Sequence, residues 1–441
     1  MSSAPRWTTP RRLRATIGAI WAAAALMFLV GAGALVANRA ALRAIVHDTA
    51  PSIVTAQELG AQLADLDAQL ASSLLGSASD REVATELFEL RRSTATRLVT
   101  DAAHAMTLGD AERIPIVVVA EELGRYLELA ARAQWLYVGG DRGGAVDLLR
   151  QATGLMHARI LPAANALDAV NRDHMDAQYD RAQHDGGAHE VEAFAAGALL
   201  VVVLVAAQVQ IRRRMRRRLV PALVLATFLT VVFTSYLVGR FRSGRESLRA
   251  ARDDAFNSIH LLWRARAIAY DASGDQSRWL LDRDRAVDHE AQYRQKVSQL
   301  VSRPTGVSRE DVRRGVVTGL LVDEVNNVTF VGEADAVNAA FAALDSLSRV
   351  DDHMRELERE GKHAEAVEVC IGSKTGEAKD AFDRFEAALE RTTAVNQRAF
   401  DGIASVADRG LRRAEWLDPA FALAIALLGW LGIRPRVREY A

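Results

Sequence analysis

The stretch QIRRRMRRRLVP, residues 210–221, places six arginines in seven consecutive positions between two long apolar runs. Such a cluster is typical of a nucleic-acid patch, a targeting signal or a loop held on one side of a membrane. The flanking runs, Phe194–Ile211 and Leu219–Gly239, carry no charge, and a helix needs about 20 apolar residues to cross a bilayer. The stretch is therefore predicted to be a short loop between two membrane spans.

Two further apolar runs lie near the ends of the chain. Ala15–Asn38 carries no charge, and Trp416–Ile433 carries only Asp418, near its start. The first run is too long for the apolar part of a signal peptide and ends in a poor cleavage site, so we expect a retained anchor. The sequence thus predicts four transmembrane helices, at residues 15–38, 193–211, 219–239 and 416–433.

The basic residues predict the orientation of these spans. With four spans, residues 1–14, 212–218 and 434–441 share one side of the membrane, and all three segments are rich in arginine. Because Lys and Arg are enriched on cytoplasmic flanks, we expect both termini in the cytoplasm of a multi-pass plasma-membrane protein. Segments 39–192 and 240–415 would then be extracytoplasmic.

The central loop is predicted to lie beside anionic lipid head groups. A nucleic-acid surface would add base-stacking aromatic side chains, and the loop has none. The loop arginines are Arg212, Arg213, Arg214, Arg216, Arg217 and Arg218.

Composition narrows the class of protein. The chain has 441 residues, a net charge of −1, only nine prolines and a single cysteine, Cys370, which is a helical profile. One thiol allows neither an intrachain disulfide nor a cysteine-based zinc site. No catalytic constellation stands out, so we expect no enzyme, no cofactor and no metal. HDGGAHE, residues 184–190, is interpreted as a flexible hinge rather than a metal site.

The two outer segments each predict a four-helix bundle, so the fold class is all-α. In the first segment, leucines from Leu59 to Leu74 recur at steps of four and three, which marks one helix face, and turns are expected at 76–80, 108–115 and 138–144. In the second, a first helix is expected to break at DASGD, 271–275, and a second to end near Val301.

Corresponding features of the two halves predict an internal duplication of span, bundle and span. GGDRGGAVDL in the first half matches EGKHAEAVEV in the second, a glycine-containing turn followed by Ala-Val on a new helix. Residues 302–334 are extra sequence in the second copy. Part of that insert, GLLVDEVNNVTFVGE at 319–333, is less periodic, and a docking surface, a re-entrant loop and packing filler all remain open for it.

The segment 263–282 supplies the candidate binding residues. Trp263, Arg266 and Tyr270 follow a spacing that shares one helical face, and Arg278, Trp279 and Asp282 are expected to face them across the break. Trp, Tyr and Arg are enriched at binding hot spots. An amino-acid ligand would need a cation such as Arg266 or Arg278 and an acid such as Asp271. The alternative is that the aromatic residues fill the core and the charges are solvated.

Two resemblances bear on function. Residues 38–76 resemble the first helix of the four-helix-bundle sensory domain of bacterial chemoreceptors. The order of spans and bundles, with LLWRARAIAYDASGDQSRWLLD at 261–282 and GLLVDEVNNVTFVGE at 319–333, resembles the actinobacterial GlnX family. That resemblance implies a relay of glutamate or glutamine status from an extracytoplasmic solute-binding lipoprotein, GlnH, to a cytoplasmic Ser/Thr protein kinase, PknG.

The expected function is therefore a transmembrane signal transducer with a partner on each side of the membrane. The alternative is a scaffold or assembly protein in which nothing switches. A transporter is disfavoured because the spans carry no charged residue near mid-membrane.

Overall fold

The computed structural model describes residues 9–76, 78–215, 220–303, 305–307, 311–312 and 314–438, and all regular structure in these residues is helical. The helices in chain order are α1 (Thr9–Leu42), η1 (Arg43–Thr49), α2 (Ala50–Ser73), α3 (Ala78–His104), α4 (Asp110–Val138), α5 (Arg142–Leu155), η2 (Met156–Ile160), α6 (Leu161–Met215), α7 (Pro221–Arg249), η3 (Ala250–Phe256), α8 (Asn257–Leu281), η4 (Arg283–Arg285), α9 (Ala286–Leu300), α11 (Leu320–Asn326), α12 (Glu333–Arg359), α13 (His363–Ile371) and α14 (Ala378–Arg438). The segments η1, η2 and η3 are π-helical and η4 is a 3-10 helix.

Four uninterrupted helices in the described chain are long and apolar enough to cross a membrane, as the sequence predicted. They are Arg11–Ser73, Arg142–Arg213, Pro221–Leu281 and Ala378–Arg438. Each therefore extends well beyond the roughly 20 residues that a bilayer requires. These helices indicate a multi-pass membrane protein.

The chain divides into two compact units. The first contains Met1–Val46, Asp176–Ala250 and Gly402–Ala441, which include the four apolar stretches. Its core contains Ile20, Met27, Leu204, Phe233 and Ile425, while other large apolar side chains on the same helices are exposed, Leu29 and Phe228 among them. An apolar exterior is what helices in lipid present.

Small residues bring the helices of this first unit close together. A Cβ atom at Gly197 would collide with Thr234, and one at Gly31 would lie 3.1 Å from Oδ2 of Asp418. Arg240 Nη1 donates to Asp418 Oδ2 at 2.8 Å, and its Nη2 donates to the carbonyl of Gly31 at 3.4 Å. The glycine contacts fit the close helix packing expected in lipid.

The predicted hinge at 184–190 is wrong, because these residues are helical within α6. Glu190 accepts from Arg242 Nε at 2.6 Å and from Arg245 Nη2 at 2.8 Å. A Cβ atom at Gly186 would lie 3.0 Å from the Arg245 side chain. The glycine therefore leaves room for the arginine rather than loosening the helix.

The second unit contains His47–Met175 and Ala251–Asp401, so most of each predicted outer segment lies in one compact unit. The chain turns near three predicted positions, before α3, before α5 and, at the EGKH sequence of 360–363, before α13. The turn predicted at 108–115 lies earlier, because α4 already begins at Asp110. Asp141 accepts from the backbone N–H of Gly144 at the start of α5. One apolar core contains Leu66, Tyr126 and Met156, and another contains Leu344 and Phe385. The duplication itself stays a prediction.

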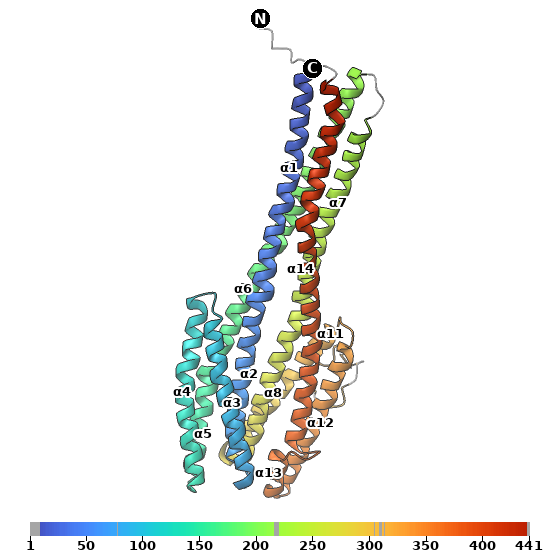
Figure 1. The fold of residues 1–441 in the computed structure, drawn as a ribbon. Coiled ribbons are helices and arrows are strands. Elements are labelled where there is room, and N and C mark those ends of the chain that lie inside the picture. The colour runs from blue at the N-terminus through green and yellow to red at the C-terminus, as the bar shows by residue number, and fades with distance from the viewer. Residues whose placement is uncertain are drawn as a thin grey trace. The chain divides into compact units, whose positions relative to one another are not determined.

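The helices α2 and α8 are largely buried. They pack along each other in this unit (Figure 1). Residues 61–68 of α2 are all buried, which covers every face of a helix. Ser72 Oγ lies 3.0 Å from Ser277 Oγ, and Gln57 contacts His260. The residue numbers of these contacting pairs increase together along the two helices, so α2 and α8 run parallel.

The predicted break at 271–275 is wrong, because α8 continues to Leu281 and the chain turns only at Asp282. The second helix consequently begins at Ala286. A Cβ atom at Gly274 would lie 3.2 Å from Cα of Ala68 and 2.9 Å from Nη2 of Arg278. The glycine in this motif therefore allows close packing of α8 on α2 and does not form a turn.

Candidate functional site

A buried cluster of charged side chains lies where α8 packs on α2. Arg278 is only 2 % exposed. Its Nη1 lies 2.7 Å from Oδ2 of Asp67, and its Nη2 lies 2.8 Å from Oδ1 of Asp275 and 3.5 Å from Oδ1 of Asp271. The guanidinium therefore contacts one carboxylate of the first half of the chain and two of the second. These charge-assisted contacts raise the pKa of Arg278, against the effect of its burial.

A second cation completes this cluster from α9. Lys296 Nζ lies 2.8 Å from Oδ1 of Asp271 and 2.6 Å from Oδ2 of Asp275. From η2, His157 Nε2 lies 3.0 Å from Oδ1 of Asp271. Burial by itself would raise the pKa of Asp271, but the His157 hydrogen bond and the nearby cations hold it well below its usual range.

Neutral donors bind the remaining carboxylate, Asp67. Tyr126 Oη from α4 donates to its Oδ1 at 3.2 Å, and Thr153 Oγ1 from α5 donates to the same atom at 3.1 Å. Burial and the neighbouring Asp67 charge raise the pKa of Tyr126, so this phenol stays a neutral donor. Side chains from α2, α4, α5, η2, α8 and α9 thus meet in a single network.

A second ion pair joins the halves at the end of α8. Arg150 from α5 binds Asp282 through both oxygens, with Nε 2.8 Å from Oδ2 and Nη2 2.5 Å from Oδ1. His289 Nε2 lies 3.3 Å from Oδ2 of the same carboxylate. Burial lowers the pKa of His289, although its bond to Asp282 opposes that effect. Because two nitrogens of Arg150 bind the two oxygens of Asp282, the relative orientation of these side chains is fixed.

The residues Trp263, Arg266 and Tyr270 do come together, as their spacing predicted. The Arg266 guanidinium lies 5.1 Å from the Trp263 ring centroid, within the range of a cation–π contact. Arg266 and the Tyr270 hydroxyl both contact the Glu386 carboxylate of α14. These side chains therefore tie α8 to α14.

Trp279 packs separately from that group. The Arg355 guanidinium of α12 lies 4.6 Å from the Trp279 ring centroid, and Arg355 Nε donates to Asp351 Oδ2 at 2.8 Å. Because the expected break is absent, Arg278 and Trp279 lie on α8 itself and Asp282 directly follows its last residue. The assignment of these residues to ligand binding stays a prediction.

Sequence reasoning missed the partners of the predicted residues. Asp67, Lys296, Arg150 and Glu386 complete the contacts of Arg278, Asp271, Asp282 and Arg266. One signal was available: in LADLDAQL, residues 63–70, two acids interrupt a leucine-rich helix. Acids in such a position are costly unless they are paired, so they predict buried cations nearby.

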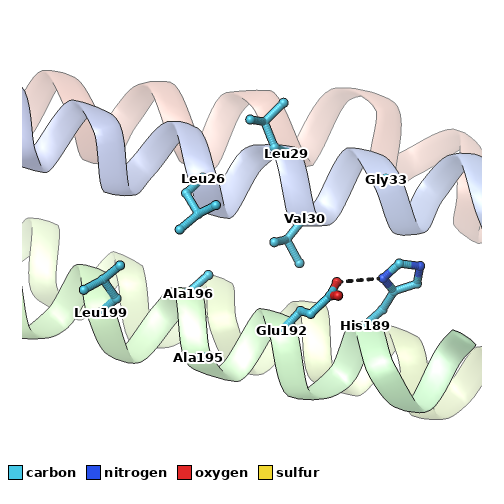
Figure 2. A pocket seen from close by; sticks show the side chains of 9 residues that line it. All are labelled: Leu26, Leu29, Val30, Gly33, His189, Glu192, Ala195, Ala196 and Leu199. Atoms are coloured by element: carbon cyan, nitrogen blue, oxygen red, sulfur yellow. Dashed lines mark hydrogen bonds and ion pairs between the residues drawn. The ribbon is translucent and has the colours of Figure 1, made fainter.

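A separate groove lies in the first unit, between α1 and α6, and encloses about 530 Å³. Figure 2 shows Leu26 and Val30 of α1 facing Ala196 and Leu199 of α6 across it. At one end, His189 Nδ1 lies 3.0 Å from Oε2 of Glu192. The groove suits an apolar group, and no set of side chains in the described residues could hold a metal ion.

The predicted basic loop is described only in part. Arg212 and Arg213 are exposed near the end of α6. Arg214 is helical, and its side chain is not described. Arg216, Arg217 and Arg218 lie outside the described residues.

Part of the chain matches a known protein family. Residues 41–180 match a family model described as an actinobacterial sensor domain. No curated protein and no solved structure matches the chain. The matched region includes α2 with Asp67, α4 with Tyr126 and α5 with Arg150. The match supports a sensor protein of actinobacteria, in agreement with the sensory domain that residues 38–76 resemble.

Proposed function

We propose that the chain is a transmembrane signal transducer that relays the status of an extracytoplasmic solute to a cytoplasmic partner. The solute class we propose is an amino acid, delivered by a solute-binding lipoprotein, and the inner partner is a Ser/Thr protein kinase. The chain itself supplies no catalytic step in this scheme. The sensor-domain match at 41–180 supports the sensing role.

The observation that carries the proposal is the charged contact between α2 and α8. Both helices continue without a break from apolar stretches, in Arg11–Ser73 and in Pro221–Leu281. Asp67 and Arg278 join them by a buried ion pair. Separating a buried ion pair leaves uncompensated charges, so the two helices have discrete packed arrangements rather than a continuous range. A shift of α8 along α2 would therefore be a change between two states. A ligand that binds one state better would move that equilibrium.

The proposed orientation puts residues 1–14, 212–218 and 434–441 in the cytoplasm, where their arginines would meet acidic surfaces of the kinase. Single cysteines at residues 3 and 441, in a Cys370→Ser background, test this arrangement. Both should react with a membrane-permeant maleimide and resist an impermeant one in intact cells. Labelling by the impermeant reagent would refute the orientation.

A disulfide across the α2–α8 contact tests the relay. Ser72→Cys with Ser277→Cys, in a Cys370→Ser background, would replace the pair of hydroxyls that lie 3.0 Å apart. In an actinobacterial host without its own copy, glutamate or glutamine addition should change kinase-substrate phosphorylation with the reduced protein. The oxidised protein should give no change, and reductant should restore it. A scaffold would leave phosphorylation equal in both forms, which would refute the relay.

A further inference from the structure

The segment 319–333, which the sequence left open, encloses a carboxyl group with no access to water. Within it, α11 packs Leu321 and Val322 into the core of the second half. Glu324 lies between them and the end of the helix and is 0 % exposed. At α11 the segment is therefore packed in the core and forms neither a docking surface nor a re-entrant loop.

The side chain of Asn327 is hydrogen-bonded to the π-helical segment η3. Its Nδ2 donates to the carbonyls of Asp253 at 3.3 Å and Asp254 at 3.0 Å, and to Ser258 Oγ at 2.8 Å. A π-helical turn carries one extra residue and is frequently found at functional sites. Asn327 therefore stabilises an irregular turn at the beginning of α8.

Ser258 and Asn396 connect these hydrogen bonds to Glu324. The Ser258 hydroxyl accepts from Asn327 Nδ2, and its polar hydroxyl favours the charged form of the Glu324 carboxyl. Asn396 Nδ2 of α14 donates to Glu324 Oε1 at 3.3 Å. In the described part of the chain, Glu324 Oε2 has no hydrogen-bond partner and Glu324 forms no ion pair. A buried carboxylate in such a place is costly, whereas a protonated carboxyl is not.

The other acid that faces Glu324 belongs to α12. Glu333 Oε2 accepts from the backbone N–H groups of Thr329 at 2.7 Å and Phe330 at 2.9 Å, while its Oε1 is buried without a partner in the residues described. Burial, with the negative charge of Glu333 adding to it, raises the pKa of Glu324 to about 7. The bonds from Ser258 and Asn396 oppose this rise only in part.

We propose that Glu324 is the proton-binding group of a clamp on η3, formed by Glu324, Ser258, Asn327 and Asn396. With its proton in place, the Glu324 carboxyl contacts Ser258 and Asn396. Ser258 in turn accepts from Asn327, whose amide also donates to the carbonyls of η3. Loss of the proton puts a charge in this buried site, beside Glu333, and the clamp opens. Acid thus closes the clamp.

The expected pH dependence follows from linkage. The carboxyl has a pKa of about 7 with the clamp closed and near 4.5, its ordinary value, once water reaches it. Between these two pKa values the closed form binds more protons than the open form. The ratio of open to closed clamp therefore increases by up to about tenfold for each unit that the pH rises, and it is constant outside that window.

Hydrogen exchange read by mass spectrometry, on the full chain in detergent, tests the clamp. Peptides covering 250–258 and 320–327 should lose protection between pH 5 and pH 7, after correction for the intrinsic exchange rate. Glu324→Gln, which keeps the acceptor and cannot ionise, should abolish that change. Asp323→Asn, the exposed neighbour, should leave it intact.

Asn327→Ala is a second test, needed in case Glu324→Gln alters the packing. It should raise exchange at 250–258 at every pH, because the hydrogen bonds from Asn327 to η3 are lost. The proposal is overturned if Glu324→Gln keeps the wild-type pH profile, or if the wild type has none. It is also overturned if chelation with EDTA removes the pH dependence, since a bound cation would then be responsible.

Discussion

Arg278 Nη1 lies 2.7 Å from Oδ2 of Asp67, and both side chains are no more than 3 % exposed. This ion pair joins the first half of the chain to the second, 211 residues apart. Two charges in such a place are tolerated only because each meets the other and additional donors or acceptors. The stability of the second unit should therefore depend on both partners.

Arg278→Met should destabilise the second unit by about 3–5 kcal/mol, because it leaves three carboxylates with too few cations. Asp67→Asn should cost about 1–3 kcal/mol, and the double variant should cost less than the sum. Denaturant unfolding in detergent, followed by circular dichroism, measures all three. Arg294→Met, which removes an exposed pair with Glu290, is the control and should stay within about 1 kcal/mol. Additive losses would contradict the pairing.

Gly274→Ala should destabilise the protein by about 1–3 kcal/mol, since its Cβ would press on Ala68 and Arg278. Gly60→Ala is a matched control on α2, where a Cβ atom would meet nothing within 4 Å. It should be neutral or stabilising by up to about 1 kcal/mol through helix propensity. Thermal unfolding of both variants gives the comparison. Equal effects would argue against the close approach of α2 and α8.

The parallel pairing of α2 and α8 predicts a specific disulfide. In a Cys370→Ser background, Ser72→Cys with Ser277→Cys should oxidise readily in membranes, detected by mass spectrometry of the linked peptides. Cys370 must be removed because its Sγ lies 3.9 Å from Ser277 Oγ and would compete. Ser73→Cys with Ser277→Cys should not link, since Ser73 Oγ binds Gln134 of α4 instead. Linkage at 73, and not at 72, would refute the register.

Acid should weaken the charged cluster through Asp271. Its pKa is held below the ordinary value of 3.8, so its contribution is present above that value and is lost progressively as the pH falls from there toward the lowered pKa. The thermal midpoint of the wild type should fall between pH 5 and pH 3, and Asp271→Asn should fall less from a lower start. Asp284→Asn, at an exposed acid, should follow the wild type. A wild-type curve parallel to that of Asp271→Asn would contradict this assignment.

The sequence by itself determined the features that depend on local pattern. Uncharged runs specify long apolar helices, because backbone groups in lipid must bond within their own helix. Turns such as 138–144 follow from glycines and a capping acid, Asp141, whose hydrogen bonds are local. The shared face of Trp263, Arg266 and Tyr270 followed from helical spacing alone.

Only the tertiary structure decided which faces meet. The break expected at 271–275 was wrong because Gly274 serves a contact with Ala68, some 200 residues away, and no local rule records that contact. For the same reason Arg278 could be named from the sequence while Asp67 could not. Helical periodicity tells which residues share a face of one helix, but the neighbour of that face is set by packing of the whole unit. Such packing decides whether a charge is solvated or buried in a pair, and so decides the candidate site.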